Sequence, residues 1–211
     1  DRTVELAREM GAVVVERPFD GFIEQKNAAL DAASFDWVLS LDADERLSPE
    51  LMASVTALFQ DGAEPPLPGY YMPRLSFHLG RWIHHGGWYP DRKLRLVDRR
   101  RGRWGGRKVH EKIVLDGEVG LLVGDIQHFP YRDLHHHLTK MDRYTTMAAE
   151  ILLEEGRSLP LVRLMVQPPL QFLKAYFLRG GILDGRAGFL LALLHARYEF
   201  LRLRKLVQLK A

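Results

Sequence analysis

The stretch that decides the fold is WVLSLDADERLSPEL, residues 37–51. It opens with a largely apolar run, residues 37–41, which has the length of a buried strand, and a cluster of acids follows at once. Ser48 and Pro49 then stand where a helix N-cap and the first helical position are expected. The stretch therefore predicts a strand, an acidic loop and a helix.

The segments on either side continue this alternation up to residue 62. We expect a helix over residues 4–10, a buried strand in AVVVE (12–16), a helix in GFIEQKNAALDAAS (21–34) and a helix in SPELMASVTALFQDG (48–62). Strands that alternate with helices are typical of α/β proteins, in which helices cover a parallel sheet. Residues 1–62 should therefore form parallel strands covered by helices.

The pattern changes beyond residue 62. Short strand candidates lie in YYMPRLSF, RKLRLVD, KIVLDG and GEVGLLVGDIQHF. Residues 133–156 predict one helix, whose apolar side comprises Leu134, Leu138, Met141, Ala148 and Leu152. From Leu159 to Ala211 the chain should be helical, with breaks at Pro168-Pro169 and Gly180-Gly181.

Composition narrows the possible chemistry. The 211 residues are 46% hydrophobic and 27% charged, which is typical of a folded globular protein. There is no cysteine, so disulfides and thiolate metal sites are excluded. The formal net charge of +3 permits anionic partners without selecting one. The opening DRTVELAREMGA predicts an amphipathic helix rather than a signal peptide, and no apolar run reaches the ~18 residues that span a bilayer.

The acidic loop suggests a metal site. Asp42 and Asp44 are two residues apart, so an extended backbone would place both carboxylates on the same side. Two hard oxygen ligands suit Mg²⁺ or Mn²⁺, whose shell is completed by water and substrate phosphates. The alternative is that these acids only decorate the turn before the helix. The metal interpretation is favoured because the acids directly follow a buried strand.

The order of several motifs resembles that of inverting family 2 glycosyltransferases. In that family a Gly, a Lys-Asn or Arg-Asn pair and an Ala-rich helix precede a strand that ends in D-x-D. Here these are Gly21, Lys26-Asn27 and Asp42-Ala43-Asp44. RKLRLVDRRRGRW, KVHEKIV and IQHFPY are similar to the subgroup that builds lipopolysaccharide inner core, the β-1,4-glucosyltransferases.

This resemblance implies an α/β fold of the GT-A type, a Rossmann-like nucleotide-diphospho-sugar transferase fold, with a C-terminal helical tail. Asp1-Arg2-Thr3 look like the Asp-x-Thr that follows the family's second strand, so the chain is expected to be N-terminally truncated. We expect a catalytic domain over residues 1–132, with a donor half at 1–62 and an acceptor half at 63–132. Residues 133–211 would form the helical region.

The resemblance also assigns donor contacts. Asp42 would face the nucleoside and Asp44 would bind the Mg²⁺ or Mn²⁺ that bridges the donor diphosphate. Lys26 and Asn27 would lie near the nucleotide; the alternative for Lys26 is an ordinary solvated lysine. UDP-glucose is the donor that the subgroup implies, with ADP-heptose as an alternative.

Inverting transfer needs a general base for the acceptor hydroxyl. We expect Glu111, in VHEK, to be this base, with Asp91, in YPDRK, as the reserve candidate. The alternative for Glu111 is a strand-edge glutamate that pairs with a neighbouring Lys or Arg. His110 could orient the base or be purely structural.

Histidines supply further candidates. The resemblance implies that His128, in DIQHFPY, is another metal or diphosphate contact, since many GT-A enzymes supply such a histidine from late in the chain and neutral imidazole is a good Mn²⁺ ligand. A buried structural histidine is the alternative. His84-His85 and His135-His136-His137 are interpreted as surface or acceptor-loop residues, because adjacent side chains point in different directions.

Arginines surround Trp104 between Asp98 and Lys108. Arginine clamps phosphate, so Arg103, with Arg95 in the preceding strand candidate, is expected to hold the donor diphosphate or a phosphorylated acceptor. A solvated basic hairpin is the alternative, and nucleic-acid binding ranks below both because the run is short.

The C-terminal region mixes Leu and Phe faces with Arg and Lys, which fits helices lying on an anionic membrane surface. A lipid-linked saccharide acceptor at the cytoplasmic face of the inner membrane would suit this placement. Ordinary packing of a helical tail is the alternative. For the whole chain, the alternative to an enzyme is a catalytically inactive relative that binds membrane or glycan.

Overall fold

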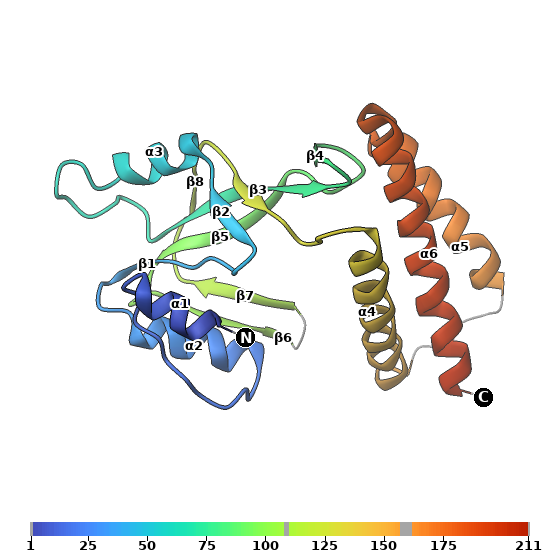
Figure 1. Ribbon diagram of the computed structural model, residues 1–211, viewed down its shortest axis with the longest axis horizontal. Helices are drawn as coiled ribbons and strands as arrows, with labels where there is room; N and C mark the ends of the chain where they lie inside the picture. Colours follow the sequence, from blue (N-terminus) through green and yellow to red (C-terminus); the bar gives the residue numbers. More distant parts are fainter. Residues whose placement is uncertain (1, 108–109, 157–161, 211) are drawn as a thin grey trace. The chain divides into compact units, whose positions relative to one another are not determined.

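The computed structural model describes residues 2–107, 110–156 and 162–210 (Figure 1). It is a mixed α/β protein. The helices are α1 Thr3–Glu9, α2 Phe22–Ala32, α3 Pro49–Ala57, α4 Leu134–Glu154, α5 Val162–Leu173 and α6 Gly185–Lys210, with a π-helical turn at Lys174–Leu178 and a 3-10 turn at Gly181–Asp184. The strands are β1 Trp37–Leu39, β2 Glu45–Leu47, β3 Gly69–His78, β4 Arg81–Ile83, β5 Asp91–Asp98, β6 Gly102–Arg107, β7 His110–Leu115, β8 Gly120–Leu121 and β9 Ile126–His128.

The described chain divides into two compact units. Unit 1 comprises Asp1–Leu41, Ala53–Met72 and Lys93–Val123, and unit 2 comprises Asp42–Met52, Pro73–Arg92 and Gly124–Ala211. The boundary runs through β3, β5 and α3, which each contribute residues to both units.

Unit 1 is built from short strands and a hairpin. β1 pairs antiparallel with β5, with Leu39 opposite Leu96. β8 pairs parallel with the first residues of β3, and β6 and β7 form an antiparallel hairpin. The core of this unit is a cluster of Val97, Trp104 and Ile113.

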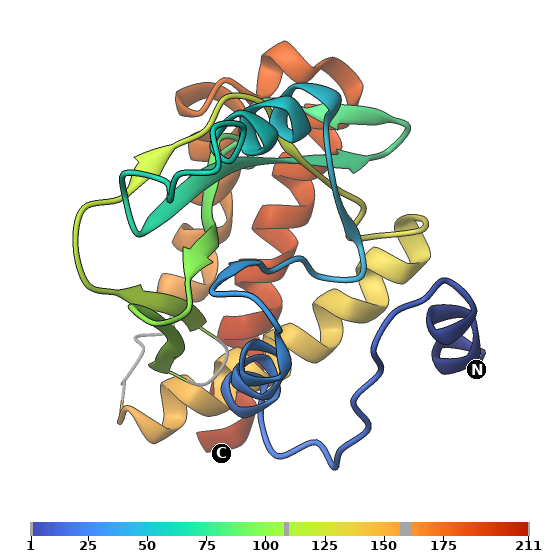
Figure 2. The same ribbon diagram turned by 90° about the vertical axis from the view of Figure 1, so that its left-hand side faces the viewer.

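Unit 2 combines strands with the C-terminal helices. β9 lies between β2, to which it is antiparallel, and β3, to which it is parallel; β4 pairs antiparallel with β3. α6 packs on α4 and α5, and Figure 2 shows α6 and α4 crossing. Ile83, Met141, Leu191 and Leu194 form the buried core of this unit.

α3 begins with the N-cap that the sequence predicts. The hydroxyl oxygen of Ser48 accepts a hydrogen bond from the Leu51 N–H at 3.2 Å, so Ser48 is the N-cap. The same oxygen accepts from the Asp125 N–H at 3.2 Å. Gly124 has φ +97°, and a Cβ there would lie 2.3 Å from the Leu51 nitrogen, so only glycine allows this close approach.

The strand predicted for residues 12–16 is wrong. These residues are not in a strand, and Val13 and Val15 are 90% and 53% exposed. A strand is stabilised by pairing to a neighbour, and no described strand pairs with this segment. The parallel arrangement predicted for residues 1–62 is also wrong, because β1 and β2 both pair antiparallel, with β5 and β9.

The helical predictions are partly confirmed. α4 occupies the predicted range, but its buried side includes His137 and Thr145. The break at Pro168-Pro169 is wrong, because α5 continues through both prolines. The break at Gly180-Gly181 is confirmed, since Gly180 has a left-handed φ of 68° that only glycine adopts easily. Among the described helices, none is both long and apolar enough to cross a membrane.

Candidate active site

The acidic loop of unit 2 is a turn rather than an extended strand end. The Asp42 carbonyl accepts from the Glu45 N–H at 3.0 Å, and the Asp42 N–H donates to the Glu45 carboxylate at 3.1 Å. The expectation that an extended backbone aligns Asp42 with Asp44 is therefore wrong. β2, which begins at Glu45, is not among the strands that the sequence predicts.

Asp44 and His128 lie side by side nevertheless. The Asp44 Oδ2 and the His128 Nε2 are 3.5 Å apart, and the Phe129 N–H donates to the Asp44 carbonyl at 2.8 Å. The pairing of β2 with β9 causes this, because it sets Glu45 opposite His128. Two residues 84 positions apart are thereby brought together, as the site prediction requires.

The state of His128 suits a metal ligand. Burial, with the nearby charge of Arg74, lowers its pKa, so the imidazole is neutral at neutral pH. Its Nδ1 lies 3.0 Å from the Ser76 hydroxyl. When Nδ1 carries the proton and donates it to Ser76, the Nε2 lone pair is presented on the side of Asp44.

The donor set fits a divalent cation with few protein ligands. No group of three or more acids and histidines that could hold a metal occurs in the described part of the chain. One carboxylate and one neutral imidazole fit Mg²⁺ or Mn²⁺, which keeps several waters and takes further oxygens from substrate phosphates.

Arg74 joins two carboxylates beside this pair. Its Nη1 donates to the Glu45 Oε1 at 2.9 Å, and its Nε and Nη2 donate to the Asp91 Oδ2 at 3.0 and 2.6 Å. The Glu45 side chain is 0% exposed. Burial by itself would lower the pKa of Arg74. The hydrogen bonds to Glu45 and Asp91 and the charges of these carboxylates outweigh burial, so the pKa is raised.

Sequence reasoning missed Arg74. The available signal was the alternation in β3, where Arg74, Ser76 and His78 share one face and apolar residues share the other. Such a polar face is normally assigned to solvent. Here it lies against a cavity of about 520 Å³ in unit 2, whose lining includes Arg74, Ser76, Trp88, Asp91, His128 and Tyr131.

Buried histidines lie beside this cavity. The His78 Nε2 and the His137 Nδ1 are 2.9 Å apart, and Tyr131 stacks on His137 with ring centroids 4.0 Å apart. Burial, with nearby His78, His195 and His136, lowers the pKa of His137 to about 4. The interpretation of His137 as a surface residue is therefore wrong, whereas His135 is exposed as expected.

Unit 1 holds the other predicted base and the Lys-Asn pair. The Lys26 Nζ lies 3.6 Å from the Glu111 Oε1 and 4.2 Å from the centre of the Trp104 ring. The Asn27 amide donates to the Trp104 carbonyl and accepts from the Trp104 N–H, both at 3.0 Å. Asn27 thereby links α2 to β6.

Two arginines of the basic run of unit 1, Arg100 and Arg103, pair with acids. Arg103 forms two hydrogen bonds of 2.9 Å with Asp31, which lower the pKa of that exposed carboxyl. Arg100 contacts Asp98, Asp36 and Glu64. Arg95 is buried with its guanidinium 5.8 Å from the centre of Trp104.

Some predicted residues fall outside the description. Asp1 and Lys108 lie outside the described residues, as do the side chains of Arg107 and His110.

The chain is similar in sequence to known glycosyltransferases. The family described as Glycosyl transferase family 2 matches residues 1–113. The chain is 33% identical over 193 residues to the lipopolysaccharide core biosynthesis glycosyltransferase LpsC of Rhizobium meliloti, covering 90% of this chain and 71% of LpsC. It is 28% identical over 218 residues to an uncharacterized glycosyltransferase of Rickettsia typhi, covering 99% of this chain and 75% of that protein.

These matches confirm the predicted family and, through it, the GT-A fold and the enzyme class. A glycosyltransferase of this family uses a nucleotide-sugar donor and a saccharide acceptor. The chain therefore belongs to glycosyl transferase family 2 and is related to an enzyme of lipopolysaccharide core biosynthesis.

Proposed function

We propose that this enzyme moves a sugar from a nucleotide-diphosphate donor to a lipid-linked lipopolysaccharide core saccharide, with inversion and with the help of Mg²⁺ or Mn²⁺. The observation that carries the proposal is the Asp44–His128 pair, whose side chains are 3.5 Å apart. His128 also lines the same cavity as Asp91, a candidate general base. UDP-glucose is the proposed donor, and ADP-heptose is the alternative. LpsC, by its name, acts in lipopolysaccharide core biosynthesis, which supports the acceptor class.

Asp44 and His128 would hold the metal ion. When bound, the ion would neutralise the charge that develops on the leaving diphosphate. Ser76 keeps the His128 ring in the orientation that presents Nε2 to Asp44. Lys26, Asn27, Asp42, Arg95 and Arg103 remain our proposed donor contacts.

Asp91 is the general base that we propose. It lines the cavity together with His128, and Arg74 fixes its orientation through two hydrogen bonds to one carboxylate oxygen. It would take the proton of the acceptor hydroxyl as that oxygen attacks the anomeric carbon and the bond to the diphosphate breaks. Glu111, the first candidate from the sequence, lies beside Lys26 instead, which favours the alternative of a paired glutamate.

Metal-dependent nucleotide binding tests the proposal. Calorimetry with UDP should detect binding in the presence of Mn²⁺ and little without it. Asp44→Asn should weaken Mn²⁺-dependent binding by about 10-fold or more, because it replaces the one proposed carboxylate ligand by a neutral amide. Glu150→Gln, at an exposed position of α4, is the matched control and should bind as the wild type does. Equal affinity of Asp44→Asn and the wild type would refute the metal site.

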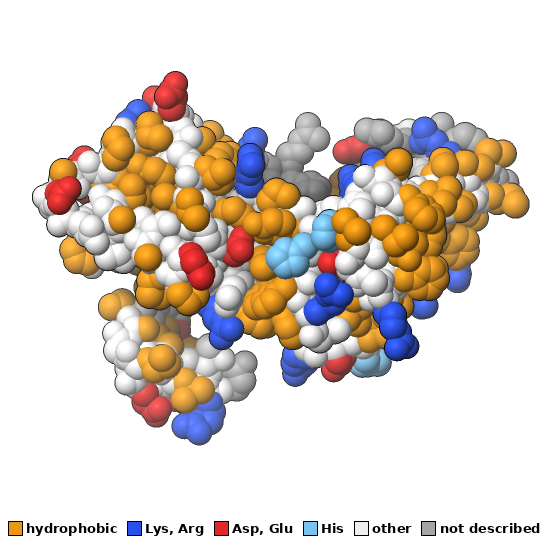
Figure 3. All heavy atoms as spheres, turned by 90° about the horizontal axis from the view of Figure 1, so that it is seen from above, with side chains coloured by type: hydrophobic (Ala, Val, Ile, Leu, Met, Phe, Trp, Pro, Cys, Tyr) orange, Lys and Arg blue, Asp and Glu red, His pale blue; other side chains and the backbone are white. Residues whose placement is uncertain are grey.

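The helical part of unit 2 supports our proposal that the enzyme is peripheral to the cytoplasmic face of the inner membrane. Exposed apolar side chains follow α5 and the turns after it, each at least 47% exposed: Met165, Leu170, Leu173, Phe177, Leu178 and Leu183. The charged residues between Val162 and Leu183 are all basic. Figure 3 shows hydrophobic side chains gathered over the helical part, with Lys and Arg among them. This combination suits an anionic lipid surface.

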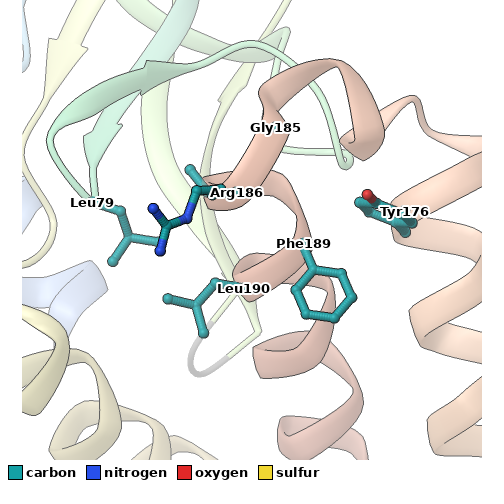
Figure 4. Close-up of a pocket in the computed structure, with 7 residues that line it drawn as sticks. Leu79, Tyr176, Gly185, Arg186, Phe189 and Leu190 are labelled. Carbon is teal, nitrogen blue, oxygen red and sulfur yellow. The ribbon is translucent and has the colours of Figure 1, made fainter.

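A second cavity lies in the same region. Its volume is about 560 Å³, and Leu79, Tyr176, Arg186, Phe189 and Leu190 line it (Figure 4). Tyr176 precedes α6, which carries Phe189 and Leu190. Its mostly apolar side chains are compatible with the lipid part of the acceptor.

Vesicle sedimentation tests the membrane proposal. The wild type should sediment with phosphatidylglycerol vesicles and much less with phosphatidylcholine vesicles. The double variant Met165→Asp, Leu178→Asp should bind at least about 10-fold more weakly, because it places two charges on the apolar face. Val13→Asp, at a residue that is 90% exposed in unit 1, is the control. Unchanged sedimentation of the double variant would contradict the proposal.

A further inference from the structure

The 520 Å³ cavity of unit 2, which His128 and Asp91 line, carries one positive charge that the side chains lining it do not balance. The charged side chains that line it are Arg74, Asp91 and Arg179. Arg74 and Asp91 pair with each other. Among the described residues, the Arg179 guanidinium forms no ion pair and no hydrogen bond. An arginine of this kind provides a fork of donors for an oxyanion.

Arg179 is held in place through its backbone and through a glycine. Its carbonyl accepts from the Gly86 N–H at 2.9 Å. Its side chain lies against Gly87, where an added Cβ would come within 2.6 Å of the Arg179 Nη1. Gly87 has φ +87°, a conformation that disfavours other residues. The close approach of the guanidinium to this turn therefore depends on glycine.

His195 adds a second donor to the same cavity. The Trp88 indole N–H donates to the His195 Nε2 at 3.0 Å. Because an indole nitrogen can only donate, Nε2 is the acceptor, and in the neutral ring the proton lies on Nδ1. This Nδ1 is buried and has no hydrogen-bond partner. A buried donor without a partner is uncommon and indicates a ligand or water that the protein alone does not supply.

We propose that Arg179 and His195 form a subsite for an anionic substituent, a phosphate or carboxylate, carried by the acceptor saccharide. Arg179 would bind two oxyanion oxygens, and the His195 Nδ1–H would donate to an oxygen of the same group. Trp88 and Tyr131 provide aromatic surface for the sugar ring in the same cavity. The proposal rests on the proposed function, since it takes this cavity as the acceptor site.

Binding of small sugars to the whole protein tests the subsite. The probes are glucose 6-phosphate, glucuronate, methyl glucoside and inorganic phosphate, measured by calorimetry or saturation-transfer NMR. The two charged sugars should bind at least about 10-fold more tightly than methyl glucoside and than inorganic phosphate. Arg179→Gln should remove this preference, and Arg179→Lys should restore part of it, because lysine keeps the charge without the fork.

Arg197→Gln is the matched control. Arg197 is an exposed arginine on α6, two residues from His195, and its replacement should leave the preference for charged sugars unchanged. The proposal is overturned if Arg179→Gln binds the charged sugars as the wild type does. It is equally overturned if methyl glucoside or inorganic phosphate binds as tightly as glucose 6-phosphate.

Nucleotide binding separates this proposal from the proposed function. Arg179→Gln should bind UDP with Mn²⁺ as the wild type does. A matching loss of UDP affinity would assign Arg179 to the donor and overturn the acceptor subsite. If Asp44→Asn leaves UDP binding intact while the preference for charged sugars depends on Arg179, the metal proposal fails and the subsite stands.

Discussion

The two units each hold an acid beside a cation, but the surroundings differ. In unit 1, Lys26 and Glu111 are 3.6 Å apart, and their side chains are 21% and 20% exposed. In unit 2, Arg74 contacts Glu45 at 2.9 Å and Asp91 at 2.6 Å, and the Glu45 side chain is 0% exposed.

The two pairs differ in how firmly the cation holds the acid. An ammonium is a point charge on a flexible stem, so a partly exposed lysine pair fixes neither partner strongly. A guanidinium that donates to two carboxylates at once, Glu45 at 0% and Asp91 at 37% side-chain exposure, fixes both of them. Unit 2 therefore has the better preorganised acid.

The largest expected effect is on kcat, and it tests which unit supplies the general base. Asp91→Asn should lower kcat by about 10²- to 10⁴-fold, because the base is lost while the shape is kept. Glu111→Gln should keep most of the turnover. Steady-state transfer assays with a saturating donor measure both. Near wild-type turnover of Asp91→Asn together with a loss in Glu111→Gln would return the base to unit 1.

Arg74→Met tests the stability of the unit 2 network. Removing the cation takes the positive charge away from the buried Glu45 carboxylate, which keeps its hydrogen bond from the Asp42 N–H; the free energy of unfolding should fall by about 3 kcal/mol. Urea unfolding measures this change. Arg46→Met is the control, because Arg46 is exposed and its guanidinium contacts no carboxylate among the described residues: it donates to Gln127 and lies over the Phe129 ring. A loss in Arg74→Met no larger than in the control would show that the network is not stabilising.

The buried histidines of unit 2 predict a pH dependence. The pKa of His137 is about 4 in the folded protein, below the ordinary 6.5, so the unfolded chain binds the proton first. Stability should be complete above pH 6.5 and fall toward pH 4, by at most about 3 kcal/mol from this residue. His78 and His195, whose pKa values burial also lowers, act in the same direction.

Thermal unfolding between pH 4.5 and 7.5 measures this effect. His137→Gln should flatten the pH profile, since glutamine does not titrate in this range. His135→Gln, on the exposed side of the same helix, should leave the profile unchanged. Parallel profiles for His137→Gln and the wild type would show that His137 does not cause the dependence.

Asn27→Ala tests the corresponding link in unit 1. It removes two hydrogen bonds to the Trp104 backbone, so the free energy of unfolding should fall by about 1–3 kcal/mol. Glu24→Ala, on the exposed part of α2, is the control. Calorimetry with UDP and Mn²⁺ on the folded variant then shows whether Asn27 also contacts the donor. An unfolding free energy equal to that of the control would contradict the structural link.

The smallest effect is expected at Arg103. Both Arg103 and Asp31 are exposed, so Arg103→Gln should leave the unfolding midpoint unchanged within error. A clear fall in UDP affinity in the same variant would support a donor contact, and unchanged affinity would remove Arg103 from the donor site.

Much of the candidate site could be predicted from local sequence. Ser48 caps α3 because its hydroxyl accepts from the Leu51 N–H, which has no partner within the helix. This local hydrogen bond does not depend on the fold of the rest of the chain. Asp44 and His128 were predicted separately, through the order of motifs, and the structure brings them within 3.5 Å. The metal itself remains a prediction.

The environments of Arg74, His135 and His137 could not be predicted from local sequence. Arg74 lies in β3 among apolar neighbours, and nothing local says whether its face meets solvent or a cavity. His135 and His137 are two residues apart and look alike in sequence, yet one is exposed and the other is 7% exposed. Their difference depends on which residues of other elements cover each side of α4.

The family, the α3 cap, the α4 range and the residue types of the proposed metal pair follow from the sequence alone. These depend on local hydrogen bonding and on the order of motifs along the chain. Three further features came only from the folded chain: Arg74 orients Asp91, Glu111 lies beside Lys26, and Arg179 and His195 line the same cavity as Asp91. Each of these depends on burial and on contacts between distant segments, because a charge is paired, exposed or buried only once the chain has packed.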